Sequence, residues 1–134
     1  MKRILIVDDA PVIRQVLEQV LADEGYVVET AADGRAAWDT IVAAPPDLII
    51  SDVHMPFCDG WALLGKVRER FPLLPVLLIS ASSDPPERHA LPEHTTFLAK
   101  PFSLEALLDV AAGMIGGAAA GPLIGAAAAG ALTG

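Results

Sequence analysis

The sequence has little cysteine, few aromatic residues and little positive charge. Cys58 is the only cysteine, so no disulfide can form within the chain. Aromatic residues make up 5% of a chain that is 53% hydrophobic, which favours a core of Val, Ile, Leu and Ala. The 9 Lys and Arg residues stand against 17 Asp and Glu residues. The resulting net charge of −8 argues against binding to the phosphate backbone of a nucleic acid.

We also expect no secretory signal peptide and a cytoplasmic protein, because the first three residues lead directly into a short, strand-like apolar run. The length of 134 residues suits one domain. No charged residue follows Asp109. We therefore expect a globular domain over residues 1–115 and a Gly/Ala-rich tail over residues 116–134. Pro122 and the glycines from Gly113 onward argue against a membrane span in the tail, which leaves a mobile tail and a packed helix as alternatives.

Five short apolar runs predict five strands. The first, third and fourth are apolar throughout, which is typical of strands covered by helices on both faces. Helical patterns lie between the runs, and the last of them begins behind Ser103, a good N-cap residue. Alternating strands and helices predict an α/β fold with a doubly wound, five-stranded parallel sheet. The predicted strands are Ile4–Val7, Tyr26–Thr30, Leu48–Ile50, Val76–Ile79 and Thr95–Ala99.

Polar residues stand at the carboxyl ends of these strands, where doubly wound sheets bind ligands. Asp8 and Asp9 follow the first strand and Asp52 the third, while Ser80 and Lys100 follow the fourth and fifth. Three neighbouring carboxylates repel one another, so one would take up a proton unless a cation neutralised them. Mg²⁺ fits such a site, because it prefers oxygen ligands and keeps several waters.

Five sequence elements occur in order along the chain: Ile4–Asp9, Asp33-Gly34, Asp47–Pro56 followed by Asp59-Gly60, Ile79–Ala81 and Lys100–Phe102. Together they resemble the response-regulator receiver domain of two-component signalling, from about Lys2 to Ile115. The resemblance implies a flavodoxin-like sheet with strand order 2-1-3-4-5. We expect Asp59-Gly60 to begin a helix and Gly34 to meet a backbone requirement.

The resemblance assigns the phosphoacceptor role to Asp52. This residue would take a phosphoryl group from the phosphohistidine of a sensor histidine kinase or of a histidine phosphotransfer protein. Asp9, Asp52 and the backbone carbonyl of His54 would bind Mg²⁺, and Asp8 would act mainly through a bound water. A carboxylate can accept the group when it stays ionised and the charge on the phosphoryl oxygens is neutralised.

The resemblance also implies roles for residues of the last two strands. Lys100 would pair with the phosphoryl group, and the Ser80 hydroxyl would donate to another of its oxygens. Ser80 and Phe97 would form the two-state switch that converts phosphorylation into output. A phosphoryl group adds a charge of about −1.5 to −2 and can form one to three new hydrogen bonds, which can bias such a switch by a few kcal/mol. The Lys100–Pro101 peptide would be cis, as in the family.

The segment between Ser80 and Lys100 departs from the family pattern. Its three prolines remove backbone donors and disfavour a helix interior, so the fourth helix should be short, roughly Pro86–Leu91. In the family this helix contributes to the output face. The downstream target therefore stays open, as does a homodimer through the last helix or the tail.

Other functions were weighed against this one. A receiver-like docking module would keep the fold without being phosphorylated. A flavodoxin-like electron carrier would need a Gly/Ser/Thr-rich phosphate loop that Asp8–Val12 lacks, and an aspartate-nucleophile phosphatase would need a second carboxylate near Asp52 as acid or base. We expect a receiver with no attached output domain, which is not a turnover enzyme and signals by phosphorylation-dependent contact with another protein.

Overall fold

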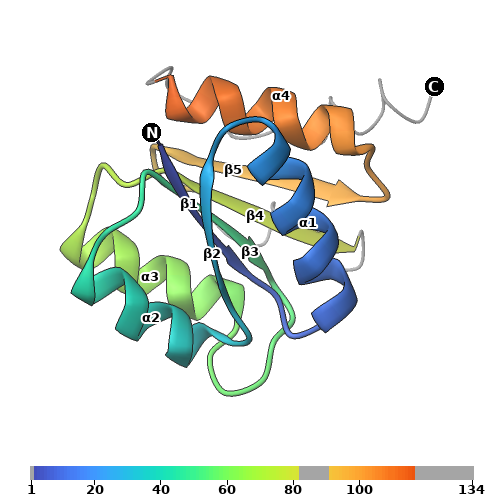
Figure 1. The fold of residues 1–134 in the computed structure, drawn as a ribbon. Coiled ribbons are helices and arrows are strands. Elements are labelled where there is room, and N and C mark those ends of the chain that lie inside the picture. The colour runs from blue at the N-terminus through green and yellow to red at the C-terminus, as the bar shows by residue number, and fades with distance from the viewer. Residues whose placement is uncertain (1, 82–90, 117–134) are drawn as a thin grey trace.

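The computed structural model describes residues 2–81 and 91–116. In this part of the chain, parallel strands form one sheet in the order β2-β1-β3-β4-β5. Helices α2 and α3 cover one face of the sheet, and α1 and α4 cover the other (Figure 1). The predicted doubly wound fold and its strand order are confirmed. The strands are β1 Arg3–Val7, β2 Val27–Ala31, β3 Leu48–Asp52, β4 Val76–Ala81 and β5 Thr95–Lys100, and the helices are α1 Pro11–Asp23, α2 Gly34–Ala43, α3 Gly60–Arg70 and α4 Leu104–Ile115.

Strands β3 and β4 extend beyond their predicted ends. Asp52 pairs with Ile79 across the two strands, and the Val53 N–H donates to the Ile79 carbonyl at 3.0 Å. The apolar runs end two residues before the backbone pairing of these strands does. A prediction based on the apolar runs alone therefore made both strands too short. The predicted helix at Pro86–Leu91 and the tail lie almost entirely outside the described residues, and both stay predictions.

The hydrophobic core has two halves, one on each face of the sheet. Alternate residues of β1 enter different halves: Leu5 and Val7 face α2 and α3, whereas Ile4 and Ile6 face α1 and α4. The central strands are buried on both faces, as their continuous apolar runs predicted. Strand β2 lies at the edge of the sheet and is only partly covered.

Three of the helices begin at a side chain that caps the first turn. In each case a side-chain oxygen accepts a hydrogen bond from the backbone N–H three residues further on, at 2.8 Å for Asp33, 2.8 Å for Asp59 and 3.1 Å for Ser103. Such a cap stabilises a helix by about 1 kcal/mol. The predicted helix starts at Asp59-Gly60 and Ser103 are confirmed. Helix α1 instead begins with Pro11 behind the N-cap residue Ala10, which follows the acidic pair Asp8-Asp9.

Candidate functional site

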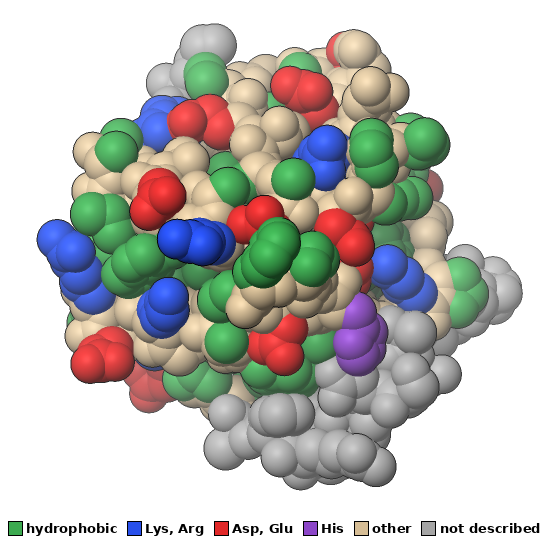
Figure 2. Space-filling view, turned by 90° about the horizontal axis from the view of Figure 1, so that it is seen from below, with side chains coloured by type: hydrophobic (Ala, Val, Ile, Leu, Met, Phe, Trp, Pro, Cys, Tyr) green, Lys and Arg blue, Asp and Glu red, His purple; other side chains and the backbone are tan. Residues whose placement is uncertain are grey.

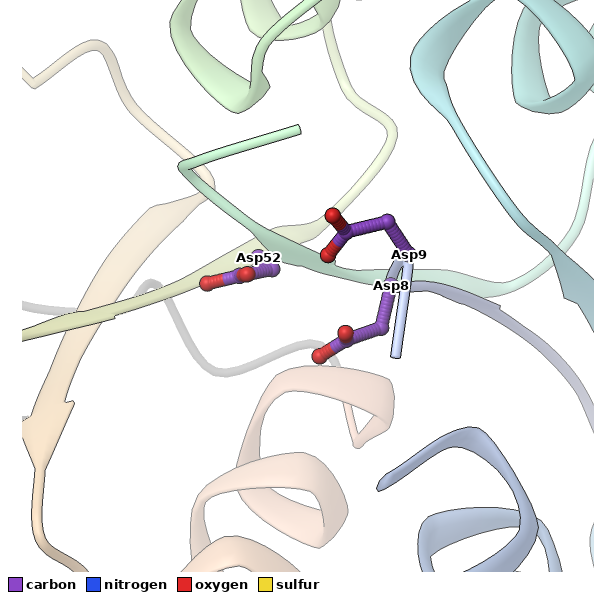
Figure 3. Close-up of side chains that lie close together, drawn as sticks. All are labelled: Asp8, Asp9 and Asp52. Carbon is purple, nitrogen blue, oxygen red and sulfur yellow. The ribbon is translucent and has the colours of Figure 1, made fainter. Parts of the chain in front are cut away.

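Three carboxylates converge at the carboxyl edge of the sheet. Strands β1 and β3 are parallel neighbours, with Val7 paired to Ser51, so the residues that follow these two meet. Asp8 and Asp9 lie at the end of β1 beside Asp52 at the end of β3 (Figure 3). One ligand oxygen from each of the three lies within 4.8 Å of the others. The fold therefore gathers these residues as the strand ends predicted.

Two of the three carboxylates are largely removed from water. Asp8 is 5% exposed, and the Asp52 side chain is 11% exposed. Burial raises the pKa of both carboxyl groups above the ordinary value for aspartate, and the charges of the neighbouring carboxylates raise it further. One backbone N–H partly opposes this effect at each residue, from Ala10 to Asp8 at 2.9 Å and from Val53 to Asp52 at 3.0 Å. A cation at this position would favour the ionised form of both groups.

Lys100, the last residue of β5, faces the same site. Its Nζ lies 3.5 Å from Oδ1 of Asp52. The ammonium group lowers the pKa of Asp52, although burial raises it by more. The Lys100–Pro101 peptide is cis, as the resemblance implied. Asp52 is thus the carboxylate that combines low exposure with a neighbouring cation.

The donor set fits a magnesium ion. Ligands on opposite sides of an octahedral Mg²⁺ lie about 4.2 Å apart, twice the bond length of about 2.1 Å. The 4.8 Å span of the three carboxylate oxygens exceeds this distance by only about 0.6 Å. Small side-chain rotations could close that difference. All three carboxylates present hard oxygen donors, the type that Mg²⁺ prefers directly or through its bound waters.

The other predicted site residues lie around this cluster. Ser80 is fully buried in β4, one residue beyond the partner of Asp52 in the strand register. His54 is exposed and follows Asp52 by two residues in the loop to α3. Phe97, only 2% exposed, lies in β5 within the core half that α2 and α3 cover. The roles assigned to these residues stay predictions.

The loop between β3 and α3 lies against the first residue of α2. A Cβ atom on Gly34 would lie 2.3 Å from the carbonyl oxygen of Cys58, so only glycine allows α2 to approach this loop. The backbone requirement expected at Gly34 is thus confirmed.

Burial raises the pKa of the Cys58 thiol, which disfavours the reactive thiolate. Next to it, Phe57 has φ 67° and is 85% exposed, an unfavourable backbone conformation for a residue with a side chain.

Sequence reasoning missed the role of Trp61 in the first turn of α3. Its ring stacks on that of Phe97, with centroids 6.2 Å apart and planes 12° from parallel. The sequence identifies both residues as core or helix positions but carries no signal that they meet, because 35 residues separate them. The available hint was that both lie in elements next to the predicted site.

The chain belongs to the response regulator receiver domain family, which it matches over residues 4–112. Such domains are the receivers of two-component signalling systems. The response regulator MprA of Mycolicibacterium vanbaalenii is 41% identical over 108 residues, which cover 79% of this chain and 47% of MprA. The chain thus spans about half the length of that relative. The expectation that no output domain is attached stays a prediction.

Two solved structures show the same architecture. The chemotaxis response regulator CheY4 of Vibrio cholerae is 38% identical with a TM-score of 0.74, over 84% of this chain and 97% of CheY4. The response regulator TrrA of Thermotoga maritima was solved in complex with Mg²⁺-BeF. It is 31% identical with a TM-score of 0.74, over 85% of this chain and 99% of TrrA.

The face covered by α2 and α3 carries charges of both signs. Figure 2 shows Lys and Arg side chains on this face among acidic and hydrophobic ones. The expectation of no nucleic-acid partner stays a prediction.

Among residues 2–81 and 91–116, no helix combines the length and the apolar character that crossing a membrane requires.

Proposed function

We propose that this receiver accepts a phosphoryl group on Asp52 from the phosphohistidine of a sensor histidine kinase or of a histidine phosphotransfer protein. The observation that carries the proposal is the position of Asp52, within 4.8 Å of two further carboxylates and 3.5 Å from the Lys100 ammonium. An Asp52 carboxylate oxygen forms the new bond to phosphorus while the bond between phosphorus and the histidine nitrogen breaks. The product is an acyl phosphate on Asp52, and the histidine returns to its free form.

Each neighbouring group supplies something that this transfer needs. Asp9, Asp52 and the His54 carbonyl would hold Mg²⁺, with Asp8 reaching it through water, and the ion neutralises charge on the phosphoryl oxygens. Burial raises the pKa of Asp52, and a cation held by these carboxylates would favour its ionised form. Lys100 would bind one phosphoryl oxygen as a charge-assisted donor. TrrA, whose structure contains Mg²⁺-BeF, offers a precedent within the family.

Output would pass through Ser80 and Phe97. Ser80, in the strand next to Asp52, would donate its hydroxyl hydrogen to a phosphoryl oxygen. Phe97 is three residues before Lys100 on β5, so a shift of Lys100 toward the phosphoryl group reaches it through the same strand. The altered surface would then dock on a protein target.

Mg²⁺-dependent labelling of the full chain with acetyl phosphate tests the proposal. The native chain should gain the mass of one phosphoryl group, and hydroxylamine should remove it, as expected for an acyl phosphate. Asp52→Asn should abolish the labelling. Asp59→Asn is the matched control, because Asp59 caps α3 outside the cluster and asparagine can also cap a helix.

An alternative is a receiver-like docking module that binds its partner without phosphorylation. A native chain that stays unlabelled, under conditions that label another receiver, would refute phosphorylation and support this alternative. Labelling of Asp52→Asn to the native extent would place the phosphoryl group on another residue.

A further inference from the structure

The stack of Trp61 on Phe97 connects two elements of the acidic site. The rings are 6.2 Å apart and nearly parallel, an offset arrangement that is favourable for two aromatic rings. Phe97 is almost fully buried, and Trp61 is half-buried against the same hydrophobic cluster. Trp61 belongs to α3 and Phe97 to β5, so the contact is tertiary.

On one side, the stack is fixed to the strand that carries Asp52. Gly60, the residue before Trp61, donates its N–H to the Val53 carbonyl at 2.8 Å. A Cβ on Gly60 would lie 2.6 Å from the Asp52 carbonyl oxygen. The start of α3 therefore rests directly on the backbone of Asp52 and Val53. A displacement of that backbone displaces the indole ring with it.

On the other side, the stack is fixed to the strand that carries Lys100. Phe97 and Lys100 lie on β5, which pairs continuously with β4 from Thr95 to Lys100. Because Lys100 also contacts Asp52 at 3.5 Å, β5 is linked to the Asp52 region twice. One link is an ion pair at the edge of the sheet, and the other is a ring stack in the core.

We propose that Trp61 is a positioning residue that couples occupancy of the acidic site to the conformation of β5 through Phe97. The proposal rests on the proposed function in one respect, namely that Mg²⁺ and a phosphoryl group are the ligands of the site. The gathered carboxylates, the Lys100 ion pair and the stack occur together in one structure. A ligand that binds only to the assembled site therefore favours the conformation that contains the stack. Loss of the stack should correspondingly lower the affinity of the site for that ligand.

Beryllofluoride with Mg²⁺ serves as the probe, since it mimics a phosphoryl group on aspartate. In a Trp38→Phe background Trp61 is the only tryptophan, and its emission should change saturably as the probe binds. Adding Phe97→Leu should remove most of this change. That measurement keeps Trp61 in place, so it does not depend on the folding of a Trp61 variant.

Calorimetric titration in the native background measures the coupling itself. Trp61→Leu and Phe97→Leu should each weaken probe binding by about two- to tenfold, the range expected for one aromatic pair. The double variant should bind no more weakly than the weaker single variant, because both substitutions remove one shared contact. Trp61→Phe keeps a ring and should bind within about twofold of the native chain.

Trp38→Leu is the matched control, because Trp38 is also a partly buried tryptophan but contacts Phe71 instead of Phe97. It should leave probe binding unchanged. Native-like binding by Trp61→Leu, or single effects that multiply in the double variant, would overturn this proposal alone. A native chain that binds no probe and takes no label from acetyl phosphate would overturn both this proposal and the proposed function.

Discussion

Buried charges have different surroundings at the two ends of the parallel strands, which we call the amino edge, where the strands begin, and the carboxyl edge, where they end. At the amino edge, the half-buried Arg68 of α3 has its guanidinium surrounded by acceptors at 2.6–3.3 Å, namely the carbonyl oxygens of Phe71, Leu74 and His94 and the Thr95 hydroxyl. At the carboxyl edge, Asp8 and Asp52 each accept one backbone N–H, and Lys100 approaches only Asp52 within salt-bridge distance among the described residues. The Arg68 guanidinium is thus surrounded by acceptors within the protein, whereas the clustered carboxylates of Asp8 and Asp52 are left with little compensation for their charge.

This difference separates stability from function. Burial lowers the pKa of Arg68, but an arginine keeps its charge at any ordinary pH, so its hydrogen bonds persist and close the amino edge. Burial raises the pKa of Asp8 and Asp52, which means that the ionised pair costs free energy in the folded protein. Binding of a cation would remove this cost, so relief of the unfavourable charge would contribute to the free energy of binding.

The largest expected effect is at the amino edge. Arg68→Met should lower the free energy of unfolding by about 3 kcal/mol, because the part-buried carbonyl and hydroxyl acceptors around it lose a charged donor. Urea unfolding of the full chain measures this loss. Arg70→Met is the control, since Arg70 is exposed and contacts only a ring face at 5.6 Å among the interactions described for it, and it should cost at most about 1 kcal/mol. Equal losses in the two variants would contradict the comparison.

Magnesium should stabilise the carboxyl edge by nearly as much. At a hundred times its dissociation constant, Mg²⁺ should raise the free energy of unfolding by about 2.7 kcal/mol. Asp9→Asn should lose most of this gain, whereas Asp59→Asn should keep it. Thermal unfolding at constant ionic strength, with and without Mg²⁺, provides the measurement. A full gain in Asp9→Asn would exclude Asp9 as a ligand.

Without Mg²⁺, Asp8→Asn should stabilise the protein by about 1 kcal/mol at pH 7. The folded-state pKa of Asp8 is raised, so between the unfolded value near 3.8 and the raised value the folded state binds more protons. The contribution of Asp8 to the free energy of unfolding of the native chain therefore falls as pH rises through that window. The advantage of the variant should disappear as pH is lowered toward 3.8. Asparagine can still accept the Ala10 N–H, so a loss of stability at pH 7 would refute the destabilising role of the charge.

The smallest effect should come from the loop beside the site. Phe57→Gly should raise the free energy of unfolding by about 0.5 kcal/mol, because relief of the backbone strain at φ 67° exceeds the added entropy of the unfolded chain. Phe57→Ala keeps the Cβ atom and should show no such gain in a chemical denaturation series. If alanine stabilises equally, the exposed ring and not the backbone is the unfavourable feature.

The carboxyl edge was predictable because its residues are marked by position along the chain. Asp8, Asp9 and Lys100 directly follow or end apolar runs, and parallel strands bring such positions to one edge. The amino edge was not predictable. Arg68, in the last turn of α3, has the sequence signature of an ordinary solvated helix cation, and only the packing of the next loop and the start of β5 surrounds it with acceptors.

Helix α1 shows the same limit within one element. Its apolar spacing correctly predicted a helix, yet Leu17 and Leu21 are buried whereas Val12, Ile13 and Val16 are 41–68% exposed. Periodicity identifies an apolar stripe but does not say how far the sheet extends beneath it. Near the start of α1 the strands have ended, so the first turns project beyond the covered core.

The order of apolar runs, helix caps and polar strand ends determined the fold and the gathering of the carboxylates, because these properties are local or follow from the handedness of parallel crossovers. The acceptors of Arg68, the exposed side of α1 and the ring partner of Trp61 were decided by tertiary structure alone. Each depends on the shape of two surfaces that come from distant parts of the chain, and complementary shape leaves no periodic trace in either segment.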